Sequence, residues 1–268
     1  MLKKIAALGL CAVVALSFTS CKGGGASVTS NAKPNLYTAN EEFADSAFEQ
    51  LKPPQSGEEI VVISTNKGDI KVRLFPEIAP QAVENFKGHA NNKYYDGTIF
   101  HRVIEGFVIQ GGDPLGNGMG GESIWGGKFG LEIHPELHHI RGALAMARAS
   151  EPRDSQGSQF YIVQNDDLDK TDSSGSLRKE LERLLETQDE IYFEEGDEIL
   201  RVGDIMPAEF LQSYLKNGGT YKLDFDYTVF GQVFSGMDVV DAIAAVKTTS
   251  DRPNEDVVIE SVRVEKYE

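Results

Sequence analysis

The sequence has almost no cysteine. Its 268 residues include 2 cysteines, Cys11 and Cys21, and both lie close to the N-terminus. The region that follows can therefore form no disulfide within its own fold, even in an oxidising compartment. We expect a fold that depends on its apolar core, which a chain of this length with 40% hydrophobic residues can form.

Positive charge is scarce as well. The chain has 26 Lys and Arg against 42 Asp and Glu, for a formal net charge of −16. Because so acidic a chain repels phosphate groups, nucleic acid is not an expected partner, and attraction to anionic membrane surfaces is not expected either. The acidic surface also favours a monomer.

Long hydrophobic runs are missing too. The apolar run IAALGLCAVVAL, residues 5–16, is shorter than the roughly 20 residues that a membrane-spanning helix needs. It follows the basic start MLKK and precedes the small residues SFTSC, which is the order of a secretory signal. We therefore interpret residues 1–20 as a signal peptide.

The residues around Cys21 resemble the signal of a bacterial lipoprotein, in which small residues precede a cysteine that is lipidated after cleavage. This resemblance implies lipidation of Cys21 and a lipid-anchored location in the cell envelope, on the periplasmic face or the cell surface. The alternative is an ordinary signal peptide with an incidental cysteine. Residues 21–57 are rich in Gly, Ser, Asn and Pro and have no sustained apolar period, which predicts a flexible tether.

The patterning strengthens from residue 58 to the C-terminus. Apolar faces at helical spacing predict helices over 79–92 and 236–246. Alternating or short apolar segments predict strands. These are a hairpin over 60–75 with its turn at 66–69, then 97–104, 107–111, 143–147, 158–164, 227–234 and 256–266.

Residues 166–219 interrupt this rhythm. They contain the charged amphipathic segment SLRKELERLLETQDEI and the segment PAEFLQSYLKNGG, which ends in a glycine stop. We interpret them as a helical insertion into a domain that spans 58–268. The strands and the two apolar helices predict a mainly β fold, a closed antiparallel barrel capped by two helices.

Four segments of the chain resemble the cyclophilins, a family of peptidyl-prolyl cis–trans isomerases, and they occur in family order. They are VENFKGHANNKYYDGTIFHRVIEGFVIQGGD, HPELHHIRG, GALAMARASEPRDSQGSQFYIV and YTVFGQVFSGMDVVDAI. The resemblance implies a cyclophilin-like barrel that catalyses rotation about X–Pro bonds and assists the folding of exported proteins. The implied partners are proline-containing polypeptides, and no cofactor or metal is expected. The alternative is a non-catalytic chaperone or binding module for proline-containing segments.

The resemblance implies a catalytic role for Arg102 and Gln110. Rotation about an X–Pro bond has a barrier of roughly 20 kcal/mol, because amide resonance must be broken. Twisting gives the proline nitrogen a usable lone pair, and the guanidinium of Arg102 would donate to it. Gln110 would bind the substrate backbone and steady the arginine.

A second set of residues is implied to bind substrate. In Tyr161 the ring of the usual phenylalanine gains a hydroxyl that needs a partner or water. Leu168 is an alternative to Leu223 as the pocket leucine. Lys222 stands where drug-sensitive relatives carry tryptophan, which predicts weak cyclosporin binding. The full set is Phe107, Val108, Ala147, Arg148, Gln159, Tyr161, Leu223 and Tyr227.

Overall fold

The computed structural model describes residues 48–168, 174–187, 192–195 and 198–268. The expected signal peptide, the lipidated Cys21 and most of the expected tether lie outside the described residues, so these remain predictions. None of the helices in the described ranges is both long and apolar enough to cross a membrane.

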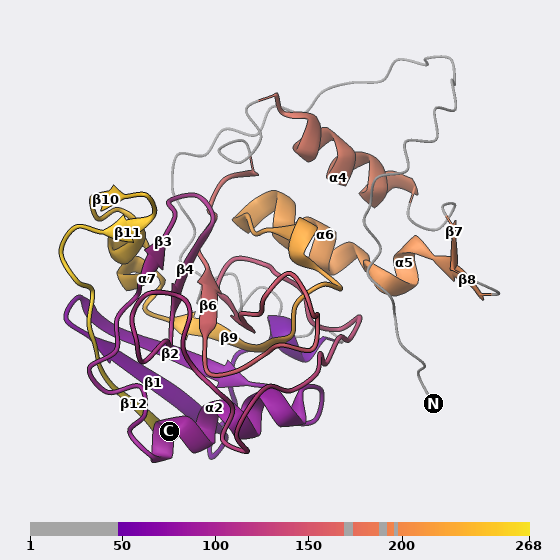
Figure 1. Ribbon diagram of the computed structural model, residues 1–268. Helices are drawn as coiled ribbons and strands as arrows, with labels where there is room; N and C mark the ends of the chain where they lie inside the picture. Colours follow the sequence, from indigo (N-terminus) through magenta and orange to yellow (C-terminus); the bar gives the residue numbers. More distant parts are fainter. Residues whose placement is uncertain (1–47, 169–173, 188–191, 196–197) are drawn as a thin grey trace.

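A curled antiparallel sheet of eight strands forms the body of the molecule (Figure 1). Its strand order is β12-β1-β2-β9-β5-β6-β4-β3, so the first and last strands of the chain pair with each other. The prediction of a mainly β, antiparallel fold is confirmed. The strands are β1 (Glu59–Thr65), β2 (Gly68–Leu74), β3 (Arg102–Val103), β4 (Val108–Gly111), β5 (Ala143–Met146), β6 (Phe160–Val163), β9 (Val229–Ser235) and β12 (Ile259–Lys266).

The sheet is a half-barrel, and the prediction of full closure was wrong. β12 and β3 are its two end strands, and no continuous ladder joins them in the described part of the chain. Ile99, which precedes β3, forms isolated bridges to Val258 before β12 and to Asp113 after β4. β3 is only 2 residues long, because a turn follows in which the Phe107 N–H donates to the Ile104 carbonyl. The outer edge of β3 is covered by a loop, since the Val103 N–H donates to the carbonyl of Asp251.

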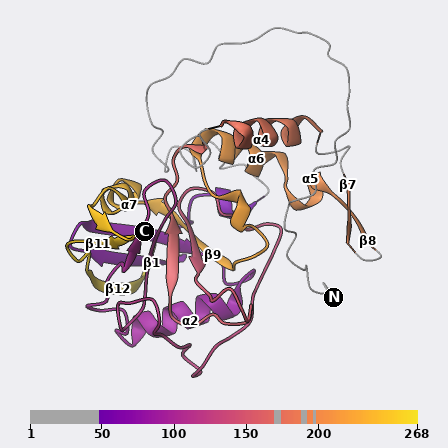
Figure 2. The same cartoon turned by 45° about the horizontal axis from the view of Figure 1, so that its top comes forward.

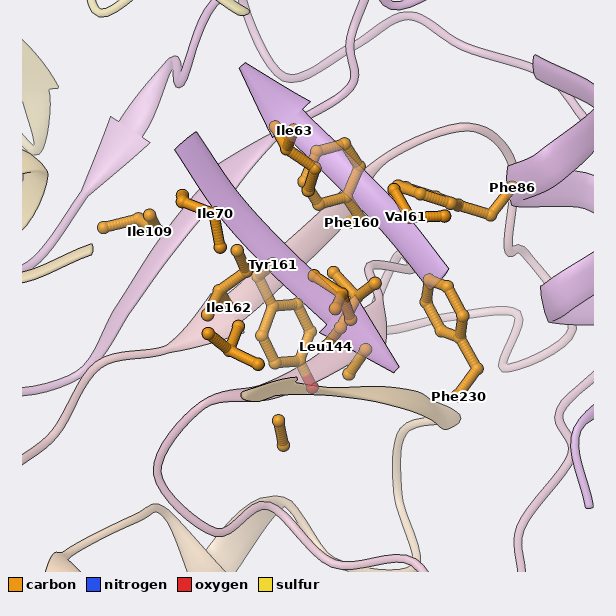
Figure 3. Packing of buried hydrophobic residues seen from close by; sticks show 14 of the residues in the cluster. Val61, Ile63, Ile70, Phe86, Ile109, Leu144, Phe160, Tyr161, Ile162 and Phe230 are labelled. Carbon is orange, nitrogen blue, oxygen red and sulfur yellow. The ribbon is translucent and has the colours of Figure 1, made fainter. Parts of the chain in front are cut away.

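Two helices cover the sheet, as predicted. α2 (Pro80–Asn91) packs against β12 and β9, and α7 (Met237–Ala244) packs against β2 and β4. Phe86 of α2 is fully buried, and its ring lies 5.0–5.3 Å from the rings of Tyr95, Phe160 and Phe230. Figure 3 shows part of this core, with strands β1 and β2 crossing over the side chains of β6.

The segment interpreted as an insertion contains both predicted helices, α4 (Ser176–Thr187) and α6 (Ala208–Asn217). They pack together on the side of the molecule away from α2 (Figures 1 and 2). Gly218, with φ of 83°, ends α6 at the glycine stop. Two short hairpins were not predicted, and neither was the helix α5. The remaining elements are β7 (Tyr192–Glu195), β8 (Glu198–Arg201), α5 (Val202–Ile205), β10 (Thr248–Thr249), β11 (Arg252–Pro253) and the 3-10 helices η1 (Glu49–Leu51) and η2 (Tyr221–Leu223).

The insertion helices form a second apolar cluster, separate from the barrel core. The buried leucines of α4 meet Phe210, Leu211 and Tyr214 of α6. Leu51 of η1 and Ile140 join them, so the cluster also covers one side of the barrel. The insertion is therefore a packed part of the same molecule.

Candidate active site

A cavity of about 250 Å³ opens beside β4 and β6, next to the chain that leaves the insertion. Nine residues line it, and all nine belong to the ten predicted catalytic and substrate-binding residues. They are Arg102, Phe107, Val108, Gln110, Ala147, Arg148, Tyr161, Leu223 and Tyr227. The tenth, Gln159, lines a neighbouring cavity together with Gln110, Ala147 and Arg148. The structure thus brings together residues from five separate parts of the sequence.

Arg102 lies at the edge of this cavity on the short strand β3. Its side chain is 41% exposed, and its Nε atom lies 3.6 Å from Oδ2 of Asp251. The guanidinium carbon is 5.9 Å from the centre of the Phe107 ring, within the range of a cation–π contact. The charge therefore stays partly hydrated while its donors remain available to a ligand in the cavity.

Gln110 faces Arg102 across the β3–β4 pair. Its Nε2 donates to Oε1 of Gln159 at 3.0 Å, and Gln159 in turn donates to the carbonyls of Gly118 and Gly120 at 3.0 and 2.8 Å. The two glutamines thus tie the glycine-rich loop to the sheet. Within the described ranges Gln110 and Arg102 share no side-chain hydrogen bond, and the expected role of Gln110 in steadying the arginine stays a prediction.

Arg148 and Tyr227 form one side wall. The guanidinium carbon of Arg148 lies 4.6 Å from the centre of the Tyr227 ring, and its Nη2 forms an ion pair with Asp226 at 2.6 Å. The Tyr227 ring meets the Tyr161 ring edge-on at 5.9 Å. The charge of Arg148 is therefore engaged in holding the wall. Of the two leucines left open by the sequence, Leu223 lines the cavity and Leu168 lies in the second apolar cluster.

Tyr161 forms part of the floor and is 4% exposed. Its hydroxyl oxygen lies 2.9 Å from Nε2 of His139, which is the partner that the extra hydroxyl required. Burial raises the pKa of Tyr161 well above its ordinary value, so the hydroxyl keeps its proton. The floor is thus an aromatic ring with a tethered polar end.

The family model for cyclophilin type peptidyl-prolyl cis-trans isomerase/CLD matches residues 60–264. The chain belongs to the cyclophilin-type peptidyl-prolyl cis–trans isomerases. A Staphylococcus aureus (strain USA300) relative, provisionally named a peptidyl-prolyl cis-trans isomerase, is 44% identical over 216 residues, 80% of this cyclophilin and 96% of the relative. A relative from Staphylococcus haemolyticus with the same provisional name is 43% identical over 215 residues, covering 80% and 95%.

Longer and more distant relatives share the same region. This cyclophilin spans 38% of a Streptococcus pyogenes serotype M6 protein, provisionally named a bifunctional phosphatase/peptidyl-prolyl cis-trans isomerase, at 44% identity over 207 residues, 76% of this chain. A Cryptosporidium parvum cyclophilin, crystallised in the presence of the dipeptide Ala-Pro, is 29% identical with a TM-score of 0.56. The match covers 78% of this chain and 99% of that one.

The sequence did not predict the groups behind the pocket floor of this cyclophilin. His138, His139 and Asp224 are buried together, and Tyr214 of α6 joins them. The hydroxyl of Tyr161 signalled that a partner was needed. No spacing signal pointed to Asp224, because it lies 85 residues from His139.

Proposed function

We propose that the cavity holds the proline ring of an unfolded polypeptide and that Arg102 catalyses rotation about the preceding bond. The observation that carries this proposal is a half-exposed guanidinium at the edge of a cavity lined by Phe107, Tyr161 and Leu223. The Ala-Pro dipeptide used with the Cryptosporidium parvum relative supports proline-containing peptides as ligands.

The catalytic step needs no covalent chemistry. In a planar X–Pro amide the nitrogen lone pair is delocalised, so a donor aimed at the nitrogen gains little. When the bond is half rotated, the lone pair is localised on the proline nitrogen. The nitrogen can then accept a hydrogen bond from an N–H of Arg102. This interaction is stronger in the transition state than in either planar form, and so it lowers the barrier. The apolar walls hold the ring while the other side of the bond turns.

A protease-coupled assay on a tetrapeptide with an Ala-Pro bond tests the proposal. Replacing Arg102→Ala should lower kcat/KM by about 100- to 1000-fold, as for the loss of one donor directed at a transition state. Arg263→Ala on β12 is the matched control, because this side chain is 48% exposed and should leave the rate unchanged. Full activity in Arg102→Ala would contradict the mechanism. A folded wild-type protein that gives only the uncatalysed rate would favour the non-catalytic binding module.

We also propose that the protein is exported, lipidated on Cys21 and active as a monomer on proteins that fold outside the cytoplasm. The support is the signal-like segment before Cys21 and the acidic composition of the chain. Cys21→Ser should abolish incorporation of labelled fatty acid and move the protein out of the membrane fraction. Cys11→Ser is the control and should change neither. Equal membrane retention of both variants would refute the lipid anchor, and sedimentation equilibrium would test the monomer.

A further inference from the structure

The direction of the Tyr161 O–H bond affects the polarity of the cavity floor. Tyr161 lines the cavity, and Figure 3 shows its ring among the apolar side chains of the core. A buried hydroxyl is costly unless it is hydrogen-bonded, and Tyr161 meets this need with Nε2 of His139 at 2.9 Å. The polarity of the floor depends on whether the Tyr161 hydroxyl or Nε2 of His139 is the donor in this hydrogen bond.

The other side of the His139 ring decides the direction. Nδ1 of His139 lies 2.9 Å from Oδ1 of Asp224, and the backbone N–H of His139 donates to the same oxygen at 2.6 Å. Burial would raise the pKa of Asp224, but the charge of His138 and the hydrogen bonds of His138 and His139 hold the pKa well below its ordinary value. The ionised carboxylate only accepts, so Nδ1 carries the proton. In a neutral ring Nε2 then accepts from the Tyr161 hydroxyl.

The charge of Asp224 is balanced by His138. Nδ1 of His138 lies 2.8 Å from Oδ2 of Asp224, and its Nε2 lies 2.9 Å from the carbonyl oxygen of Pro135. Both partners only accept, so both nitrogens of His138 donate and its ring is a cation. Tyr214 adds an uncharged donor to Oδ2 at 2.8 Å. Because the carboxylate is already paired with one cation, a second charge on His139 would lack a counter-charge in this buried site.

We propose that His139 and Asp224 are positioning residues that keep the floor of the proline pocket apolar. His139 accepts a hydrogen bond from the Tyr161 hydroxyl, which directs the O–H away from the cavity. The proline then meets the ring face and not an O–H donor. Without that acceptor the hydroxyl turns toward the cavity and holds water there. This water opposes burial of the proline ring and weakens binding.

The experiment is a double-mutant cycle on peptide affinity, and it rests on the proposed proline site. The dissociation constant of a tetrapeptide with an Ala-Pro bond is measured by NMR titration for wild type, His139→Leu, Tyr161→Phe and the double variant. His139→Leu should raise Kd about fivefold, because the hydroxyl loses its acceptor. Tyr161→Phe should remove the dependence on His139, so that His139→Leu no longer raises Kd in the Tyr161→Phe background, since a phenylalanine ring needs no acceptor.

Tyr214→Phe is the matched control. It deletes a hydroxyl donor from the same carboxylate without touching Tyr161, so it should lower the thermal midpoint and leave Kd unchanged. If His139→Leu raises Kd equally with and without the Tyr161→Phe substitution, His139 acts through the fold and the proposal is overturned. An unchanged Kd overturns it too while leaving the proline site intact. Failure of the wild type to bind the peptide overturns the proline site and this proposal with it.

A measurement on the wild-type protein remains decisive even if a variant does not fold. Nitrogen-15 NMR of the histidine rings should show His139 as the neutral form protonated at Nδ1, with Nε2 accepting a hydrogen bond. A ring protonated at Nε2 would place the Tyr161 proton elsewhere, and it would overturn the proposal.

Discussion

The two apolar clusters of this cyclophilin are built in different ways. The barrel core fills the space between the curled sheet and two helices, and it includes every residue of β5 and of β6. The second cluster connects α4 and α6 to the barrel beside Ile140 and η1, and we call this contact region the joint. Buried polar groups accompany that joint, since Gln50 donates to the His138 carbonyl at 2.6 Å and Asn165 donates to the Gly219 carbonyl at 2.7 Å. Apolar burial has no direction, whereas these hydrogen bonds fix one arrangement of the two parts.

The position of the joint matters for function. The chain leaves the insertion at Gly218 and within a few residues supplies Leu223 and Tyr227 to the cavity. Between them, Asp224 holds the histidines behind the floor and Asp226 holds Arg148. The insertion is therefore connected to the pocket through the segment that follows its last helix.

The largest expected effect contrasts the two clusters directly. Phe86→Ala in the barrel should lower the free energy of unfolding by about 4 kcal/mol, and Phe210→Ala in the insertion by about 3 kcal/mol. Both side chains are fully buried, but Phe86 contacts three aromatic rings of the core, whereas Phe210 packs against Phe48 and His138. Denaturant unfolding measures both values. A cost below about 1 kcal/mol for Phe210→Ala would show that the insertion unfolds independently.

Asp224 and Asp226 lie two residues apart, and their substitutions compare two ion pairs. Asp224 pairs with His138 behind the floor of the cavity, and Asp226 pairs with Arg148 in its side wall. Asp224→Asn should cost about 3 kcal/mol, because the His138 cation loses its buried partner. Asp226→Asn should cost less, about 1 kcal/mol, because the Asp226 carboxylate is 37% exposed although its partner Arg148 is 4% exposed. Chemical denaturation at neutral pH measures both, and equal costs would contradict the buried ion pair.

The same aspartate predicts a pH dependence. The pKa of Asp224 is lowered on folding, since His138 and His139 outweigh the opposing effect of burial. Its carboxylate therefore stabilises the fold above its unfolded-state pKa of about 4, and that contribution is lost as the pH falls below this value. The stability advantage of wild type over Asp224→Asn should shrink between about pH 5 and pH 3. A constant difference across this window would contradict the lowered pKa.

The sequence predicted most of the barrel because its signals are local. Alternation in GDIKVRLF and the apolar face of 79–92 each depend on neighbouring residues, and both elements are observed. The β10–β11 hairpin was missed because its turn uses Ser250 and Asp251 at positive φ, where Asn-Gly is the usual signal. Full closure was predicted wrongly because no local pattern marks that the strand expected from residue 97 begins only at Arg102. The cavity residues came from the family resemblance, while the network behind Tyr161 joins segments too far apart for any local signal.

The last comparison concerns Gly218, where the chain leaves the insertion. Gly218 has φ of 83° and ψ of −165°, a region open almost only to glycine, and an added Cβ would lie 2.4 Å from the carbonyl oxygen of Asn165. Gly218→Ala should therefore cost about 2 kcal/mol. Gly57→Ala is the matched control, because Gly57 has φ of 84° but open space around the added Cβ, so only the backbone penalty of about 1 kcal/mol remains. If the joint sets the pocket, Gly218→Ala should also weaken peptide binding, whereas Gly57→Ala should not. Equal peptide affinity of the two variants would mean that the chain at Gly218 tolerates displacement. The barrel alone would then shape the cavity.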